Sequence, residues 1–417
     1  MIVDFSVQNF RSIKDLETLA MNAAGIVSRN NQLEATNLIT VSPKLSLLKT
    51  KAIYGANASG KSTMIQALSR FVNIIINSVK DESILESLNS FRLSDETYFA
   101  PTYFQLSFIY NGILYRYGFE SILQEIRSEW LFGTPGKKEV PFFIREGSEI
   151  KVNENQFQEG AKVVDLYKDS ENDIARKNSL FLTVVRSFNQ GLAREIIDYI
   201  SGYIIISGLS DFYMHIKAEQ YMGQEHTRKK MAEMLKLADT GIEDIVREEY
   251  DTENADGTKE KKYRVITRHK GFDKDGKAVK SVDLYMFTME SEGTKKMFEI
   301  SPALLQSLEE GRVLVLDEFD ARFHPLLSRK IVELYNSSSN KNAQLIFATH
   351  DTNLLTSQLL RRDQICFVEK DRQGASHFYS LADFKGVRND ASFEKDYITG
   401  KYGAIPFLGD FTSLFEK

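Results

Sequence analysis

Apolar and polar residues follow a period of two at the start of the chain and a period near 3.6 after residue 60. Residues 2–8 alternate, and residues 45–54 end in the apolar run Ala52-Ile53-Tyr54, so both ranges predict strands. From Met64 to Val79 apolar residues recur at every third or fourth position, as they do on one face of a helix. The N-terminal pattern therefore predicts two strands, joined by a polar segment, and then a helix.

The pattern changes again in the middle of the chain. Asn111-Gly112 separates two alternating ranges, 102–109 and 113–120, which is typical of a β-hairpin, and strand-like sequence continues to residue 144. Residues 171–240 lose this period and are helical and charged. The ranges Tyr263–His269 and Val282–Phe287 predict a second hairpin.

From residue 300 helical and strand patterns alternate, which is typical of an α/β fold. We therefore expect a split α/β core formed by residues 1–80 and 288–417. The sequence between the two parts predicts a β-rich subdomain over residues 81–170, a helical insertion over residues 171–245 and a β-hairpin region over residues 246–287.

The run from Gly55 to Ser62 lies between a predicted strand and a predicted helix and has the pattern G-x-x-x-x-G-K-S of a phosphate-binding loop. Backbone N–H groups of such a loop surround the β-phosphate, and the helix N-terminus adds a favourable partial charge. We expect Lys61 to reach the β- and γ-phosphates and Ser62 to ligate Mg²⁺. The expected nucleotide-binding residues here are Gly55, Asn57, Ala58, Ser59, Gly60, Lys61, Ser62 and Thr63. The sequence thus predicts a site for ATP and Mg²⁺, although it does not distinguish adenine from guanine.

Two further strand ends carry residues suited to phosphate chemistry. The apolar run Val313–Leu316 leads into Asp317-Glu318, as in a Walker B strand, where Asp317 would hold Mg²⁺ through water and Glu318 would act as the general base. The apolar run Gln344–Ala348 leads to His350, at the edge of the sheet where α/β proteins bind ligands. We expect His350 to contact the γ-phosphate or the attacking water.

Ser291-Glu292-Gly293-Thr294 precedes an apolar helix and exposes a hydroxyl and N–H groups that could bind a phosphate. An ordinary helix cap explains the same residues. The place of this segment just before the Walker B strand favours the phosphate-binding interpretation.

Taken in order, these motifs resemble the ABC-type ATPase heads of the SMC, RecF and OLD group. Asn9-Phe10-Arg11-Ser12 resembles the N-terminal motif of RecF and Rad-type heads, and Ser291–Lys295 resembles a degenerate ABC signature. Residues 320–325 resemble the D-loop of the OLD-like branch, and Tyr402–Pro406 resembles the closing motif of RloA-like ATPases, which are encoded beside restriction and phage-defence genes. The resemblance covers residues 1–80 and 288–410.

The resemblance implies a P-loop NTPase head of the ABC type, with a mixed sheet, an antiparallel β subdomain and an inserted helical subdomain. It implies a homodimer or larger even-numbered oligomer in which two heads enclose two ATP molecules. Ser291 and Gly293 of one head would then bind the γ-phosphate held by the other, with Asp320 at the dimer seam and Arg11 at the nucleotide.

The sequence departs from the ABC pattern at three motifs. The signature has one glycine, the D-loop lacks Ser-x-Leu-Asp, and no single residue stands out as the Q-loop glutamine. Gln105 and Gln124 are both candidates for this magnesium ligand, and we prefer Gln124.

Composition narrows the class of protein. A net charge of −5 and one cysteine, Cys366, argue against a uniformly basic nucleic-acid-binding surface and against disulfides within the chain. No apolar stretch is long enough to span a bilayer, and residues 1–7 do not resemble a leader, so we expect a cytoplasmic protein without a membrane partner.

Three functions remain open. The chain could be a defence ATPase that senses phage and controls a separate toxin or nuclease from an adjacent gene, as RloA-like and PARIS-type ATPases are thought to do. It could be a RecF-like repair ATPase that contacts DNA through basic clusters such as Arg228–Lys230, Lys261-Lys262 and Arg361-Arg362. A transporter ATPase ranks last because the middle insertion is large. A nuclease of its own is not expected, because 67 residues follow His350 and no Asp-x-Asp follows Glu369.

Overall fold

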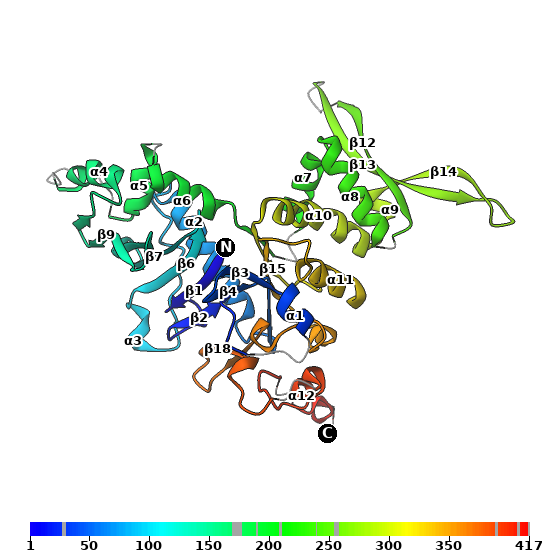
Figure 1. Cartoon of the computed structure of the whole chain (residues 1–417). Helices are drawn as coiled ribbons and strands as arrows, with labels where there is room; N and C mark the ends of the chain where they lie inside the picture. The colour runs from blue at the N-terminus through cyan, green and yellow to red at the C-terminus, as the bar shows by residue number, and fades with distance from the viewer. Residues whose placement is uncertain are drawn as a thin grey trace.

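The computed structural model describes residues 1–26, 31–168, 177–188, 191–207, 211–238, 240–253, 258–387, 391–406 and 409–415. In this part of the chain the strands form sheets of seven, six, three and two strands. Figure 1 shows the six-stranded sheet near the centre, the seven-stranded sheet on one side and the three-stranded sheet projecting from the other. The predicted α/β class, with a mixed sheet and a separate antiparallel sheet, is confirmed.

The six-stranded sheet has the order β11-β15-β16-β5-β17-β18 and is parallel except for β18. Its strands are β11 (Ile204–Ser207), β15 (Val313–Asp317), β16 (Gln344–Ala348), β5 (Thr50–Gly55), β17 (Ile365–Lys370) and β18 (Ser376–Ser380). Consecutive apolar residues of one strand enter two different cores, since Ile53 packs on one face and Ala52 and Tyr54 on the other. Both faces are covered, which is why these strands are continuous apolar runs rather than alternating ones.

Helix α2 (Lys61–Asn77) fills the space between the two large sheets. Its buried residues include Met64, Leu68, Phe71 and Ile75, which are the positions of the predicted apolar face. Phe71 stacks on Phe119 of the antiparallel sheet with ring centroids 5.6 Å apart. The helices α10 (Glu292–Glu310) and α11 (Pro325–Tyr335) contribute to the second core, on the other face of the parallel sheet.

The seven-stranded sheet is antiparallel, with the order β10-β9-β8-β7-β6-β1-β2. Its strands are β1 (Ile2–Gln8), β2 (Glu17–Ala20), β6 (Thr102–Tyr110), β7 (Ile113–Ile122), β8 (Glu125–Thr134), β9 (Val140–Glu146) and β10 (Glu149–Val152). Positive φ angles of 48° at Asn111 and 76° at Gly112 form the predicted hairpin turn. The expected N-terminal boundary is corrected here, because β1 and β2 belong to this sheet and not to the parallel core.

The predicted strand over residues 45–54 is two strands. Residues Leu45–Leu48 form β4, which pairs with β3 (Leu38–Ser42), and β5 begins at Thr50 in the parallel sheet. The remaining short elements are α1 (Asn31–Thr36), α3 (Asp95–Tyr98), α12 (Phe393–Ile398) and the 3-10 turns η2 (Thr352–Leu354), η3 (Arg362–Gln364), η4 (Leu381–Asp383) and η5 (Phe411–Leu414).

The expected helical insertion is split by a core strand. Helices α4 (Gln158–Lys168), α5 (Phe181–Ser187) and α6 (Gly191–Ser201) precede β11, and α7 (Asp211–Tyr221) and α8 (Glu225–Leu237) follow it. Buried residues of α5 and α6 pack in the core that contains α2, whereas those of α8 pack in the core that contains α10. The helical region therefore starts before residue 171 and serves two different cores.

The three-stranded sheet is an arm that projects from the body (Figure 1). It consists of β12 (Ile242–Glu253), β13 (Lys259–Phe272) and β14 (Ala278–Tyr285), with β13 in the middle. The predicted hairpin is the pair of β13 and β14, and the polar strand β12 was not predicted. A short helix, α9 (Met286–Met289), connects β14 to α10.

Candidate nucleotide site

The carboxyl ends of five parallel strands meet at one edge of the six-stranded sheet, and the phosphate-binding loop lies there between β5 and α2. Two glycines lie where the backbone passes so close to neighbouring atoms that a side chain would clash. A Cβ at Gly55 would lie 2.4 Å from the Val368 carbonyl oxygen, and Gly60 has φ 117° with no space for a Cβ beside Ser376 Oγ. Glycine is thus required at both ends of the loop for steric reasons.

Lys61 is buried at the start of α2 and its ammonium turns back into the loop. Nζ donates to the carbonyl oxygens of Gly55 at 2.8 Å and Ala56 at 3.0 Å. Burial lowers the pKa of Lys61 to about 8, although the carboxylates of Asp317, Asp320 and Glu318 oppose the shift. The nearby carboxylates therefore do not fully offset the desolvation of the ammonium, and an added polyphosphate would stabilise its charged form.

The other loop residues also suit a bound phosphate chain. Ala58 has φ 59°, a left-handed conformation that costs a residue with a side chain about 1–2 kcal/mol. Ser59 Oγ is buried without a hydrogen-bond partner in the described part of the chain. Asn57 and Ala58 are exposed, and Ser62 and Thr63 are partly buried at the first turn of α2. A strained backbone and an unsatisfied hydroxyl at a helix N-terminus fit a phosphate ligand.

The acidic pair lies at the carboxyl end of β15, where Asp317 is the last residue of the strand, and only β16 separates β15 from β5. Asp317 is buried, and its Oδ1 accepts the backbone N–H of Glu318 at 3.1 Å. Glu318 has φ 48°, so the backbone turns sharply at the end of the strand. Both carboxylates act electrostatically on Lys61. Walker A and Walker B residues predicted from separate parts of the sequence thus lie close together.

His350 follows β16, the strand between β5 and β15. Its backbone N–H donates to Asp320 Oδ1 at 3.2 Å. Desolvation and the Lys61 ammonium lower the pKa of His350, against the opposite effect of Asp320 and Asp317. The imidazole is therefore neutral at pH 7 and can donate one hydrogen bond and accept another.

Ser291 is the N-cap of α10, and its Oγ accepts the backbone N–H of Thr294 at 3.2 Å. The capping interpretation is thus correct, and the Ser291 hydroxyl shares a second hydrogen bond, 2.8 Å long, with the Thr294 hydroxyl. A Cβ at Gly293 would lie 3.1 Å from the Arg322 carbonyl oxygen, and Arg322 also pairs with Glu292 at 3.4 Å. The segments expected to be signature and D-loop are therefore neighbours within one chain.

The N-terminal motif reaches the phosphate loop through Ser12. Its Oγ lies 3.0 Å from Thr63 Oγ1 and 2.8 Å from Ser376 Oγ, within hydrogen-bond distance of both. Arg11 is exposed and hydrogen-bonds Gln66, one turn further along α2. The Ser376 hydroxyl donates to the Ser59 carbonyl oxygen at 2.6 Å. Sequence reasoning missed Ser376, since a lone serine on an edge strand gives no signal.

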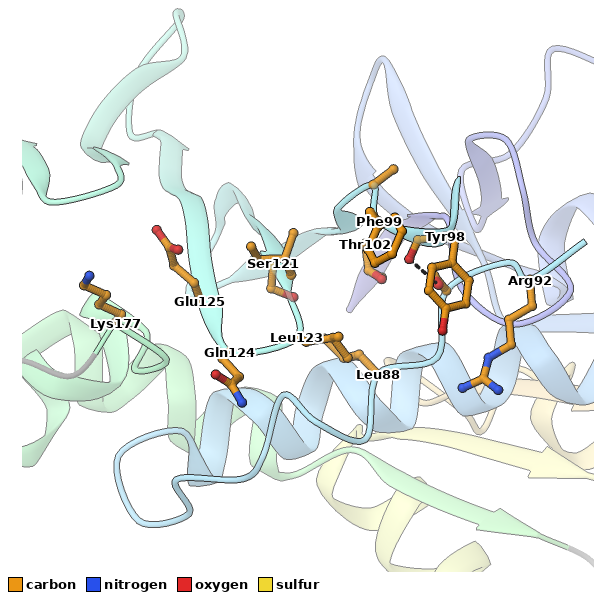
Figure 2. A pocket seen from close by; sticks show the side chains of 13 residues that line it. Leu88, Arg92, Tyr98, Phe99, Thr102, Ser121, Leu123, Gln124, Glu125 and Lys177 are labelled. Atoms are coloured by element: carbon orange, nitrogen blue, oxygen red, sulfur yellow. Dashed lines mark hydrogen bonds between the residues drawn. The ribbon is translucent and has the colours of Figure 1, made fainter. Parts of the chain in front are cut away.

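The structure corrects the placement of Gln124. This residue lies in the turn between β7 and β8. Two residues further on, the Ile126 N–H donates to the Lys177 carbonyl oxygen, and the nearby Ser179 hydroxyl donates to the carbonyl oxygen of Ser78, the C-cap of α2. The phosphate loop lies at the other end of this 17-residue helix, which is about 25 Å long. Gln124 instead lines a separate pocket of about 740 Å³ together with Leu123 and Lys177 (Figure 2).

Gln105, the second candidate, accepts hydrogen bonds from Arg116 Nη1 at 3.0 Å and Trp130 Nε1 at 3.2 Å. The strand next to the acidic pair at the nucleotide edge is β11, since its last residue, Ser207, pairs in register with Asp317. The Q-loop glutamine is therefore not supplied by the antiparallel sheet at Gln124.

The C-terminal motif has a structural role that the sequence did not suggest. Glu369 Oε2, at the end of β17, accepts the backbone N–H of Ala404 at 3.1 Å, and the Tyr379 hydroxyl donates to the Tyr402 carbonyl oxygen at 2.9 Å.

Cys366 is buried, which raises its pKa to about 11. Among the described residues no helix has the length and apolar character needed to cross a membrane.

A family model described as "AAA domain, putative AbiEii toxin, Type IV TA system" matches residues 52–356. No curated protein matches the chain. The chain is similar to the solved SMC head domain from Thermotoga maritima, with 13% identity, a TM-score of 0.43, and coverage of 91% of this chain and 98% of that one. It is equally similar to a solved SmcHead bound to the C-winged helix domain of ScpA, with 13% identity, a TM-score of 0.43, and coverage of 91% and 97%.

The matched family range contains the phosphate-binding loop, the acidic pair after β15 and His350, which together form the site described above. It spans most of the chain, from β5 to the turn η2. The chain therefore belongs to this AAA domain family and is an ATPase of the AAA type.

Proposed function

We propose that this protein is a Mg-ATP-dependent head that dimerises on ATP, hydrolyses it and regulates a separate toxin or nuclease in anti-phage defence. One observation carries the enzymatic part of the proposal. Lys61, Asp317 with Glu318, and His350 lie at the ends of three adjacent parallel strands, and Lys61 interacts electrostatically with each of the other three. A phosphate-binding cation, a general base and a neutral hydrogen-bonding imidazole are the groups that phosphoryl transfer to water needs.

Each side chain has a defined task in this proposal. Lys61 and the loop N–H groups bind the phosphates, and Glu318 accepts the proton of the attacking water. His350 orients that water or the γ-phosphate, because its lowered pKa keeps it neutral at pH 7. Ser62 and Asp317 would hold Mg²⁺, which supplies charge neutralisation for the phosphate oxygens.

In this proposal the second head supplies the N-terminus of its helix α10 to the γ-phosphate bound by the first head. Helix α10 has 19 residues, and the positive end of its dipole and its exposed cap, Ser291, are at its N-terminus. Such an end is suited to the γ-phosphate of a nucleotide held by a partner copy. Asp320, which accepts the His350 N–H, would lie at the seam between the two copies. ATP would then hold the dimer together, and hydrolysis would release it.

The link to defence rests on the description of the family, which names a toxin and a toxin–antitoxin system. An effector outside this chain is proposed because Glu369, a glutamate near the end of β17 that a nuclease site could have used, accepts the backbone N–H of Ala404. The effector would then be a second protein, which we expect from an adjacent gene.

DNA binding, the alternative partner, gains no support from the basic clusters. Arg228 pairs with Asp244 at 2.7 Å, Lys229 with Glu225 at 2.8 Å, and Lys261 with Glu249 at 3.0 Å. Lys230 pairs with Glu309, and Arg361 is buried against Asp363. Side chains neutralised in this way contribute little to phosphate contacts along DNA.

The defence role is tested by purification of the native complex. We expect the Glu318→Gln protein, loaded with Mg-ATP, to co-purify with the product of an adjacent gene, and a phage protein to release that product. Duplex DNA should leave the ATPase rate of the parental protein unchanged. Strong stimulation by DNA that falls steeply with salt, in the absence of any co-purifying effector, would replace the defence role with a repair role.

A further inference from the structure

Glu290 immediately precedes the cap residue Ser291, and its carboxylate is held by the arm rather than by the ATPase body. Glu290 Oε1 lies 2.7 Å from His269 Nε2 and accepts a hydrogen bond from the Thr267 hydroxyl. Both partners belong to β13, the middle strand of the arm. The Glu290 side chain is 8% exposed and Thr267 is fully buried, and the Thr267 hydroxyl also lies 3.3 Å from the Leu284 carbonyl oxygen of β14.

The arm is one continuous hydrogen-bonded sheet around these contacts. In β13, Thr267 pairs in register with Ile245 of β12 and Leu284 of β14, and the ladder to β12 continues to the pair Glu253–Lys259. From β14 only the four-residue α9 separates the sheet from Glu290. A displacement of the projecting part of the arm can reach Ser291 along the covalent chain through α9 and through the Glu290 carboxylate, in addition to the packing of β12 on α8 and of α8 on α10.

The residue on the other side of Ser291 is tied to the ATPase body. Glu292 pairs with Arg322 at 3.4 Å, and Arg322 lies two residues after Asp320, whose carboxylate accepts the His350 N–H. The cap of α10 is thus held between Glu290, which belongs to the arm's contacts, and Glu292, which belongs to the site's contacts. Breaking the first tie leaves the second in place.

We propose that Glu290 is a positioning residue, anchored by Thr267 and His269, through which the β12–β14 arm sets the place of the Ser291 hydroxyl and hence the rate of ATP hydrolysis. The inference rests on the proposed function, because Ser291 acts on the nucleotide of a partner head. It adds a specific mechanical route: the arm governs turnover and not the binding of ATP, which Lys61 and its loop perform in another part of the chain.

The substitution Thr267→Val tests this route with little change of shape, because valine replaces the hydroxyl by a methyl group in a fully buried strand position. We expect kcat for ATP to fall about tenfold or more, since small misplacements of a positioned group are costly. The Kd of ATP, measured with a fluorescent analogue, should stay within about twofold of the parental value. Thr267→Ser, which keeps the hydroxyl, should restore kcat.

Two further variants complete the set. Glu290→Gln should also lower kcat without changing the Kd, whereas Glu249→Gln, which removes a carboxylate paired with Lys261 further along the same arm, should leave both unchanged. Circular dichroism and thermal unfolding of each protein establish that the fold is kept. If Glu290→Gln fails to fold, the Thr267 pair decides the matter alone.

The possible results separate this inference from the proposed function. Thr267→Val and Glu290→Gln with parental kcat, in a protein that dimerises on ATP and is inactivated by Ser291→Arg, would overturn the inference alone. A parental protein that hydrolyses ATP as a monomer, with Ser291→Arg fully active, would overturn both. Loss of kcat in Thr267→Val with rescue by Thr267→Ser supports the route through Glu290.

Discussion

Raising the pH from 7 to 9 is a direct test of the environment of Lys61. Its ammonium contacts two loop carbonyl oxygens, and burial lowers its pKa to about 8 in the free protein. A bound polyphosphate favours the charged form, so the pKa of Lys61 rises again in the complex. Below pH 7 the ammonium is charged with and without nucleotide, so this group does not make the affinity for ATP depend on pH.

Above pH 8 the free protein must take up a proton in order to bind ATP. For a pKa of 8 the charged fraction of Lys61 falls from about 0.9 at pH 7 to about 0.1 at pH 9, so the Kd of ATP should rise about tenfold. The sign follows from the direction of the shift, since binding restores a charge that burial removes. Proton uptake on binding should rise from about 0.1 to about 0.9 per site over the same interval.

Neighbouring groups do not obscure this dependence. The pKa of His350 is lowered from 6.5, so its imidazole is neutral throughout the interval. Burial raises the pKa of Tyr54, so its hydroxyl stays protonated. Lys61 is thus the group near the site whose shifted pKa falls within the tested range.

Isothermal titration calorimetry on the Glu318→Gln protein measures both quantities, because the heat in two buffers of different ionisation enthalpy gives the proton uptake. Lys61→Arg serves as the control, since a guanidinium stays charged and its residual binding should not change between pH 7 and 9. A Kd of the Glu318→Gln protein that is flat over this interval, with no proton uptake, would refute the assignment of Lys61 as a buried cation with a lowered pKa.

Three further substitutions have defined outcomes. Glu318→Gln should bind ATP with parental affinity and lose at least about a hundredfold in turnover, measured by phosphate release; a parental rate would remove Glu318 as general base. Gln124→Ala should hydrolyse ATP at the parental rate, and a strong magnesium-dependent defect would show that our placement of Gln124 away from the nucleotide is wrong. Phe71→Ala deletes a fully buried ring of α2 and should lower the free energy of unfolding by about 3–5 kcal/mol in urea titrations; a loss below 1 kcal/mol would contradict its central place in the core.

The phosphate loop, the acidic pair and the first helix could be predicted because each depends on neighbouring residues. The loop needs glycine at two crowded positions, and the helix shows its buried face as a period in the sequence. The Asn111-Gly112 hairpin is equally local, since the turn needs two positive φ angles.

The errors concern partners far apart in the chain. Gln124 has the residue type of a magnesium ligand, but the turn that carries it is fixed by contacts of the antiparallel sheet with the far end of α2. Strand β11 is four residues long and lies between helices, so its period was hidden within a helical pattern. Ser376 contacts the phosphate loop only because β18 pairs with β17, which no local pattern indicates.

The central claim is that two copies of this chain close on ATP. Sedimentation velocity of the Glu318→Gln protein, with and without Mg-ATP, tests it most directly, with Glu318→Gln/Ser291→Arg as the matched control. We predict a monomer without nucleotide, a dimer with Mg-ATP, and a monomer that still binds ATP in the control. A Glu318→Gln protein that stays monomeric with ATP bound, or a control that dimerises equally well, would contradict the account.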